Sequence, residues 1–160
     1  MPNGKLWRSK VIGTYKDTLK MAIPVSKLHL HDPRKSQPRF LMLTENAIYS
    51  IDQKSWLIRD KIMLLDIRAI SLSCLRDGLF VLHGKSQIDF IFRSDELAID
   101  FNTMLIRQCK AIGCEIKVNV SNSILFHVDN NPTRISFEIS PTPANQFMTK
   151  STGGYLVSIL

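Results

Sequence analysis

Short apolar segments alternate with tight polar turns from residue 39 to residue 92, and this spacing limits the chain to antiparallel β-structure. Strands joined by only a few residues must pair antiparallel, because a parallel pair needs a much longer crossover. In Ala69–Leu75 apolar and serine side chains alternate, and the Arg76-Asp77-Gly78 turn follows, with Gly78 suited to positive φ. The expected strands are Arg39–Thr44, Ala47–Ile51, Ile62–Leu65, Ala69–Leu75, Leu79–His83 and Ile88–Phe92.

The apolar period then changes to that of a helix. Ser94 is a suitable N-cap for a helix over about residues 95–112, and Gly113 suits the left-handed position after it. Its apolar stripe is Leu97, Phe101, Met104, Leu105 and Ile112. One amphipathic helix after an antiparallel meander must cover a sheet face or a barrel mouth. The pattern therefore predicts a mainly β, α+β fold.

Further strands are expected after the helix. Glu115–Val120 alternates, with Ile116, Val118 and Val120 predicted to face inward. Ile124–Val128 and Arg134–Ile139 read as a hairpin, and Tyr155–Leu160 as a last apolar segment. Neither a repeat nor a long linker interrupts the sequence, so we expect a basic N-terminal extension over residues 1–22 and a single domain over residues 23–160.

The positive charge of the chain is local. Residues 1–40 hold nine of the 21 Lys/Arg and two of the 14 Asp/Glu, so the net +7 of the protein arises there. The rest of the chain is balanced. Concentrated positive charge attracts a polyanion, which could be a phosphorylated lipid surface, a nucleic acid or an acidic protein.

Several other classes of function are disfavoured. Among the 160 residues no apolar run reaches the roughly 20 residues of a membrane-spanning helix, and the N-terminus lacks the apolar core of a secretory signal. Neither a phosphate-binding glycine loop nor a nucleophile motif is present, so we expect a protein that is not an enzyme and needs no cofactor. His29 and His31 would need more ligands to hold a metal, and none is expected. His83 and His127 are predicted to be hydrogen-bonded residues of the sheet.

The basic segment around residues 23–43 is the candidate site. If Val25–Leu30 and Arg39–Thr44 pair, Lys27 and Arg39 lie near the mouth of the intervening loop, and Arg34 and Lys35 lie within it. Arginine offers a planar fork to phosphate oxygens and lysine a compact charge. The supporting basic residues are Lys16, Lys20, His29 and His31. An alternative reading is that this charge belongs to an ordinary solvated loop.

Nucleic acid is a further alternative partner. Trp7, Tyr15 and Phe40 near the basic segment could stack on bases. No recognised nucleic-acid motif accompanies them, so nucleic acid is not the favoured partner.

Taken together, several segments resemble the tail homology 1 domain of class I myosins. The resemblance runs from about Ile23 to the C-terminus and is carried by Val25–Lys27, Pro38–Ala47, Ile70–His83, Asp89–Leu97 and Thr149–Leu156. It implies a pleckstrin-homology-like core, a bent antiparallel barrel capped by one helix, with extra C-terminal strands. A myosin motor head is not among these residues, so we expect no ATPase activity from them.

The resemblance also implies a function. Tails of this type bind anionic phospholipids, often phosphoinositides, and link the actin cytoskeleton to membrane. The family roles of a lysine on the first core strand and an arginine opening the next fall on Lys27 and Arg39, while Leu41 stands where the general phosphoinositide signature has a second basic residue. The expected location is cytoplasmic, at the peripheral membrane and cortical cytoskeleton. Actin or an adaptor protein, bound through the basic surface, remains the alternative partner.

Overall fold

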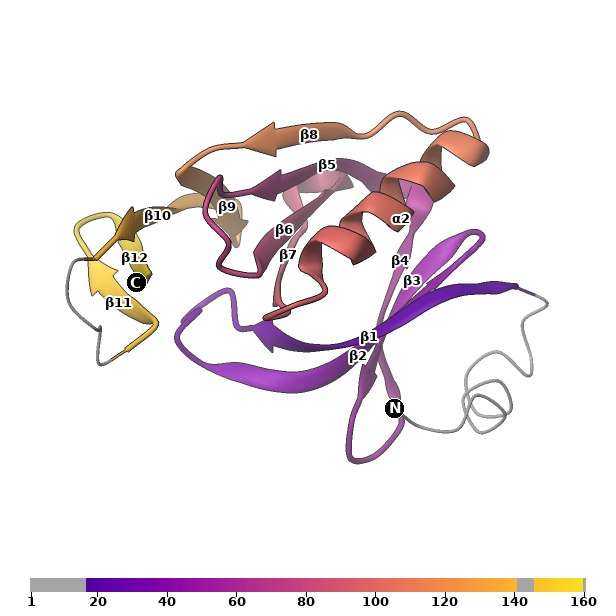
Figure 1. The fold of residues 1–160 in the computed structure, drawn as a ribbon, viewed down its shortest axis with the longest axis horizontal. Helices are drawn as coiled ribbons and strands as arrows, with labels where there is room; N and C mark the ends of the chain where they lie inside the picture. The colour runs from indigo at the N-terminus through magenta and orange to yellow at the C-terminus, as the bar shows by residue number, and fades with distance from the viewer. Residues whose placement is uncertain (1–16, 141–145, 160) are drawn as a thin grey trace.

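The computed structural model describes residues 17–140 and 146–159 (Figure 1). Within them lie one α-helix, two short 3₁₀ helices and twelve strands. The strands are β1 (Leu19–Leu28), β2 (Ser36–Thr44), β3 (Ala47–Asp52), β4 (Ile58–Met63), β5 (Ile67–Leu72), β6 (Leu79–Gly84), β7 (Asp89–Arg93), β8 (Lys117–Val120), β9 (Ser123–Val128), β10 (Asn131–Ile139), β11 (Met148–Ser151) and β12 (Gly154–Ile159). The helices are α2 (Ala98–Ala111), η2 (Leu64–Asp66) and η3 (Lys85–Gln87).

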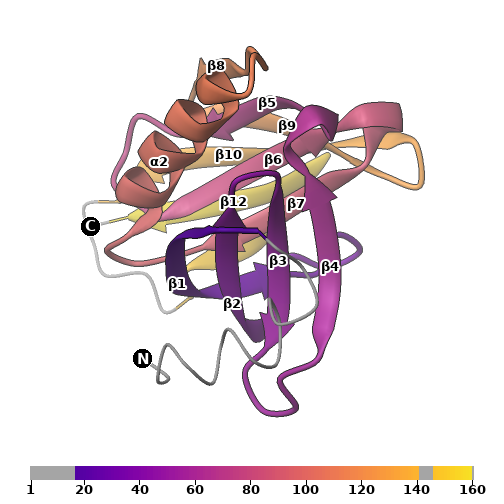
Figure 2. The same ribbon diagram turned by 90° about the vertical axis from the view of Figure 1, so that its right-hand side faces the viewer.

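The first eight strands form one sheet in the order β4-β3-β2-β1-β7-β6-β5-β8. All pairs are antiparallel except β5 with β8, which run parallel. The sheet bends so that β1–β4 cross β5–β7 at a steep angle, and its hydrogen bonding stays open between β4 and β8 (Figure 2). This is the expected pleckstrin-homology-like meander, with an open barrel.

The main core fills the concave side of this sheet beneath α2. Phe80, Phe92 and Phe101 are fully buried there, and the ring centre of Phe80 lies 5.7 Å from that of Phe92 and 5.9 Å from that of Phe101. Gln108 on α2 donates a hydrogen bond to the Glu45 carbonyl in the β2–β3 turn. The helix therefore covers the end of the barrel opposite to the β1–β2 and β3–β4 loops, which leaves those loops free to form a site.

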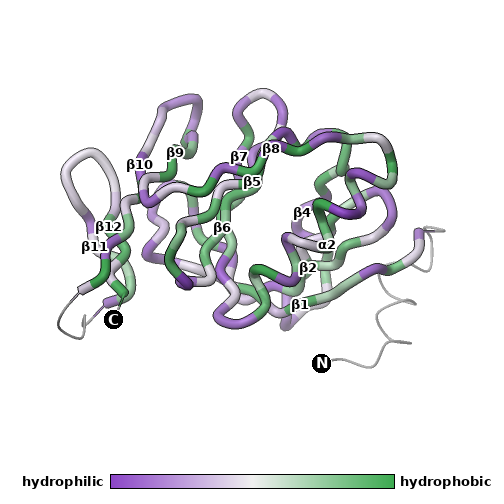
Figure 3. The backbone as a smooth tube through the Cα atoms, turned by 45° about the horizontal axis from the view of Figure 1, so that its top comes forward, coloured by the Kyte–Doolittle hydropathy of each residue, from purple (hydrophilic) through white to green (hydrophobic). Residues whose placement is uncertain are grey.

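A second, four-stranded sheet follows in the order β11-β12-β10-β9. Its apolar face packs on the outer side of β6 and β7, where Val81 and Ile91 contact Phe126 and Ile135 in a second core. Apolar stretches of the tube meet at this boundary between the two sheets (Figure 3). The expected C-terminal strands thus form a separate layer on the barrel.

Three expectations need correction, and one further strand was not expected. The strand expected over Ile62–Leu65 runs instead from Ile58 to Met63, and Leu64 and Leu65 belong to the 3₁₀ helix η2. The helix begins at Ala98 rather than near residue 95, because Ser94 accepts a hydrogen bond from the N–H of Leu97 and closes a separate turn first. Val118 and Val120 do not face inward: they are 41% and 61% exposed, because β8 is an edge strand. Met148–Ser151, a stretch without apolar alternation, forms strand β11 by pairing with β12.

The proposed boundary between an extension and a domain stays a prediction. Strand β1 begins at Leu19, and residues 1–16, which include Lys16, lie outside the described part of the chain. In the part that is described, no helix has the length and apolar character needed to cross a membrane.

Candidate functional site

Two neighbouring hairpins bring the predicted basic residues to the open end of the barrel. Strand β1 pairs with β2 so that Val25 lies opposite Arg39 and Lys27 opposite Gln37. Because side chains alternate across a strand, Lys27 and Arg39 share the concave face with the buried Val25. Strand β3 lies on the other side of β2, with Asp52 opposite Arg39. We refer to the end of the barrel formed by Lys27, Arg39 and their partners as the mouth.

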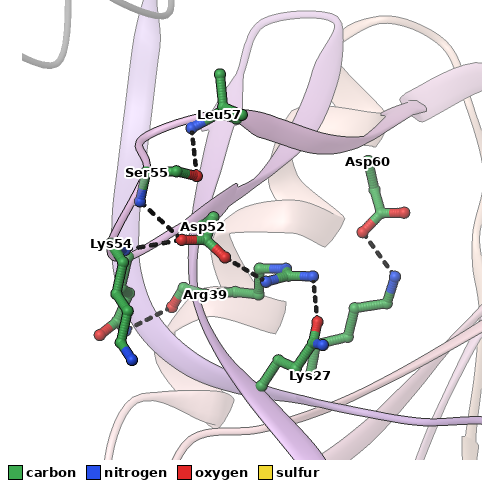
Figure 4. Close-up of polar contacts among 9 residues, drawn as sticks. Lys27, Arg39, Asp52, Lys54, Ser55, Leu57 and Asp60 are labelled. Atoms are coloured by element: carbon green, nitrogen blue, oxygen red, sulfur yellow. Dashed lines mark hydrogen bonds and ion pairs between the residues drawn. The ribbon is translucent and has the colours of Figure 1, made fainter.

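At the mouth Lys27 is held by an acid from the β3–β4 hairpin. Its Nζ lies 2.7 Å from Oδ2 of Asp60 (Figure 4). The same Nζ lies 5.5 Å from the centre of the Phe90 ring. The Lys27 side chain is 26% exposed, so the ammonium is ordered yet open to solvent.

Arg39 is more deeply placed, with only 7% of its side chain exposed. Its Nη1 donates to Oδ2 of Asp52 at 3.2 Å and its Nη2 to Oε1 of Gln37 at 2.6 Å. Among the described residues its Nε has no acceptor. The mouth therefore contains a guanidinium that is fixed by two partners and still has an unused donor.

Asp52 also organises the neighbouring turn. Its Oδ1 accepts the backbone N–H groups of Ser55 and Lys54, each at 2.8 Å. These hydrogen bonds, with a smaller contribution from Arg39, lower the pKa of Asp52, so the carboxylate is ionised at neutral pH. One carboxylate thus holds both the arginine of the mouth and the tip of the β3–β4 hairpin.

Arg34 and Lys35 lie on the other side of the β1–β2 loop. Arg34 forms a bidentate salt bridge with Asp32, with Nε 2.8 Å from Oδ1 and Nη2 3.0 Å from Oδ2. These hydrogen bonds lower the pKa of Asp32 to about 2. Lys35 is exposed and makes no ion pair with any described residue. Both line a cavity of about 500 Å³ that extends to Arg93 and to the start of β11. The four predicted residues are therefore divided between two faces of one hairpin.

The predicted supporting residues are scattered. His29 and His31 are exposed and share a cavity of about 320 Å³ with Lys27, and His31 lies 3.5 Å from Asp129. Lys20 sits at the opposite end of the barrel, 4.0 Å from Glu45. The structure thus brings the two histidines to Lys27 and leaves Lys20 apart.

Sequence reasoning missed the acids of this site. Asp32, Asp52 and Asp60 each pair with one of the predicted cations, so the cluster is close to neutral apart from Lys35. Asp52 and Asp60 come from a hairpin that looked like an ordinary polar turn. A signal was available for Asp52 alone, because an acid on a strand that pairs with a basic strand can lie opposite its cation.

A second polar cluster joins the two sheets. The buried carboxylate of Asp89 contacts Nδ1 of His83 at 2.9 Å, and Nδ1 and the backbone N–H of His127 at 3.1 and 2.6 Å. His83 Nε2 in turn lies 2.7 Å from Oγ of Ser71. The prediction that both histidines are hydrogen-bonded sheet residues is confirmed. Within the described ranges no three metal-ligating side chains come together to hold an ion.

Comparison with known proteins decides the family. The family described as "Unconventional myosin tail, actin- and lipid-binding" matches residues 2–154. The chain belongs to the unconventional myosin tail family. Mouse unconventional myosin-Ib is 39% identical over 79 residues, or 46% of this chain, and unconventional myosin-Ic-A of Xenopus laevis is 30% identical over 86% of it.

The matches cover a small part of these myosins. The chain spans 7% of the mouse relative and 13% of the Xenopus relative. Among solved structures, the hSac2 domain of human phosphoinositide phosphatase Sac2 aligns over 76% of this chain and 92% of that one, at 12% identity and a TM-score of 0.53. The DH/PH domain of human ARHGEF11 aligns over 59% of this chain and 30% of that one, at 8% identity and a TM-score of 0.50. These likenesses support the fold that an unconventional myosin tail is expected to have.

Proposed function

We propose that this myosin-tail chain is a peripheral membrane-binding module that takes anionic phospholipid, phosphoinositides included, at the mouth of its barrel. The observation that carries the proposal is the placement of Lys27 and Arg39 on one concave face, at the end that α2 leaves uncovered. The family's description as lipid-binding supports the same conclusion. The chain would act by binding rather than by catalysis, in the cytoplasm and at the cortical membrane.

The ion pairs of the mouth determine how such a site would work. A basic side chain near an anionic membrane contributes about 1 kcal/mol, and Asp52 and Asp60 offset part of that attraction. In return they hold the two cations in place, so less side-chain entropy is lost when a phosphate group binds. The Nε of Arg39 is buried and has no acceptor among the described residues. A phosphate that displaced the side chains covering this atom would accept its hydrogen bond. A site of this kind favours a polyphosphorylated headgroup over a diffuse negative surface.

The experiment is vesicle co-sedimentation of the whole chain with neutral vesicles and with phosphatidylserine and phosphatidylinositol-bisphosphate vesicles, the two anionic kinds being matched in charge. We expect binding that needs anionic lipid, weakens with salt and is stronger for the phosphoinositide. Lys27→Gln should weaken binding about fivefold. Lys20→Gln is its matched control, since it removes the same charge from the other end of the barrel. Equal losses in both variants would refute the assignment to the mouth.

Actin is the second candidate partner, because the family description names actin as well as lipid. In that case the basic surface would meet an acidic protein rather than a headgroup. Co-sedimentation with filamentous actin, without pelleting on any anionic vesicle, would favour this alternative and overturn the lipid proposal.

A further inference from the structure

The tip of the β3–β4 hairpin carries exposed apolar side chains. Leu57 is 56% exposed and Ile58 is 39% exposed, side by side where the turn re-enters strand β4. The hairpin projects beyond the strands beside it, at the lower end of the view in Figure 2. Exposed aliphatic side chains that gather at one projecting point, rather than lying scattered, mark a candidate contact surface.

The tip is held in a defined shape. The carboxylate of Asp52 accepts hydrogen bonds from the backbone N–H groups of Lys54 and Ser55. The backbone carbonyl of Asp52 accepts the N–H of Trp56 at 3.0 Å. Trp56 stacks on Phe40, with 5.4 Å between the ring centres. Leu57 is therefore presented to solvent by a fixed turn, and its side chain points away from the turn's hydrogen bonds (Figure 4).

The charges around the tip indicate what covers it. Lys54 and Arg59, both exposed, lie in sequence on either side of the Leu57–Ile58 pair. The mouth is adjacent, because Asp52 on β3 holds both Arg39 and the turn, and Asp60, on β4 with Ile58, holds Lys27. Aliphatic side chains flanked by cations match an anionic bilayer, where the cations meet headgroups and the aliphatic groups enter the acyl boundary.

We propose that Leu57 and Ile58 insert into the outer acyl region of an anionic membrane while the mouth binds a headgroup. The inference rests on the proposed function and adds an apolar contact to it. Asp52 joins the two contacts, because the same carboxylate fixes the headgroup-facing arginine and the inserting turn. Membrane binding then has a salt-sensitive part from the mouth and a salt-resistant part from the tip.

The test compares Leu57→Ser/Ile58→Ser with wild type by co-sedimentation on phosphatidylinositol-bisphosphate vesicles. We expect the double variant to bind about tenfold more weakly, because the exposed parts of the two side chains together equal about one aliphatic side chain, whose burial corresponds to a factor of about ten or more. It should also lose the binding that wild type retains at about 0.5 M NaCl. The affinity of the double variant for the soluble headgroup, inositol trisphosphate, should equal that of wild type. A variant with a damaged fold would lose this affinity as well.

The matched control is Leu65→Ser. Leu65 is 59% exposed and follows the other end of β4, so its loss should leave vesicle binding at the wild-type level. A direct readout is quenching of Trp56 by acyl-brominated lipid, measured in a Trp7→Phe background because the chain has two tryptophans.

The outcomes separate the two proposals. If the double variant binds vesicles as wild type does, or loses no more than Leu65→Ser, insertion is refuted while headgroup binding stands. If the wild type binds no anionic vesicle, the proposed function itself fails. If the double variant loses actin binding and keeps vesicle binding, the tip is a protein contact and the insertion proposal is overturned.

Discussion

Asp89 should be the residue on which the attachment of the second sheet to the barrel most depends. Its side chain is 1% exposed and receives hydrogen bonds from His83 on β6 and from both the ring and the backbone of His127 on β9. Asp89→Asn keeps the shape but replaces one carboxylate oxygen by an NH₂ group. That group cannot accept a hydrogen bond. Turned toward His127, it leaves the backbone N–H of that residue without its acceptor; turned toward His83, it forces that ring into its other tautomer and replaces a bond to a charged carboxylate with one to a neutral amide.

The magnitude follows from the bonds lost. A hydrogen bond to a charged group contributes about 1.5–3 kcal/mol, and leaving a buried donor unsatisfied adds to the cost. With one or two such bonds lost, we expect the free energy of unfolding to fall by about 3 kcal/mol. For a domain of this size that corresponds to a fall in Tm of roughly 6–12 °C.

The difference in stability between wild type and Asp89→Asn should depend on pH, in a direction set by the pKa of Asp89. Burial alone would raise the pKa of Asp89, but hydrogen bonds from His83 and His127 outweigh it, so the pKa lies below its usual 3.8. A carboxyl with a lowered folded pKa stabilises the protein above its unfolded pKa, and this stabilisation is lost as the pH falls through the folded pKa. Wild type and Asp89→Asn should therefore differ fully at pH 7 and converge well below pH 4.

The assay is urea unfolding of both proteins at pH 7 and at about pH 3, followed by circular dichroism. Asp66→Asn serves as the control, because that carboxylate is 52% exposed and its removal should change stability by less than about 1 kcal/mol. A difference under about 1 kcal/mol for Asp89→Asn at pH 7, or one that persists unchanged at pH 3, would refute the reasoning.

Two further predictions concern local chemistry. Gly78→Ala should destabilise by more than about 2 kcal/mol, since a Cβ there would lie 2.1 Å from the Ser94 carbonyl oxygen at φ +76. Gly113→Ala, at φ +78 with nothing within 4 Å, should cost only about 1 kcal/mol; equal thermal shifts would show that the close approach is not real. Burial raises the pKa of Cys109 to about 12, so in the native protein at pH 8 a maleimide should label the exposed Cys74 quickly and Cys109 only on unfolding. Fast labelling that survives Cys74→Ser, mapped to Cys109 by mass spectrometry, would contradict that burial.

The meander and the helix could be predicted because their signals are local. Alternation and tight turns specify antiparallel strands, and the stripe through Phe101 and Leu105 specifies a helix with one buried face. Gly113 has the positive φ expected after the helix. The outward placement of Val118 was not predictable in this way, since alternation shows that a strand has two faces but not that it will be an edge with neither face covered.

The candidate site was predictable only in part, for a related reason. Lys27 and Arg39 could be placed on neighbouring strands because a short loop joins them. The pairing of Lys27 with Asp60 connects residues 33 positions apart through two further strands, and no local pattern shows it. The separation of Arg34 and Lys35 from the mouth likewise depends on the direction of the loop, which Tyr155 of the second sheet contacts through a hydrogen bond to the His31 carbonyl at 3.4 Å.

The most direct test of headgroup binding at the mouth is a gain of affinity, because damage to the fold cannot produce one. Asp60→Asn frees Lys27 and adds one positive charge at the mouth, while Glu45→Gln adds the same charge beside Lys20 at the opposite end. On phosphatidylinositol-bisphosphate vesicles we predict that Asp60→Asn binds about fivefold more tightly than wild type and that Glu45→Gln changes binding by less than about twofold. Equal gains in the two variants, or no gain from Asp60→Asn, would contradict the claim that the mouth is the membrane-binding site.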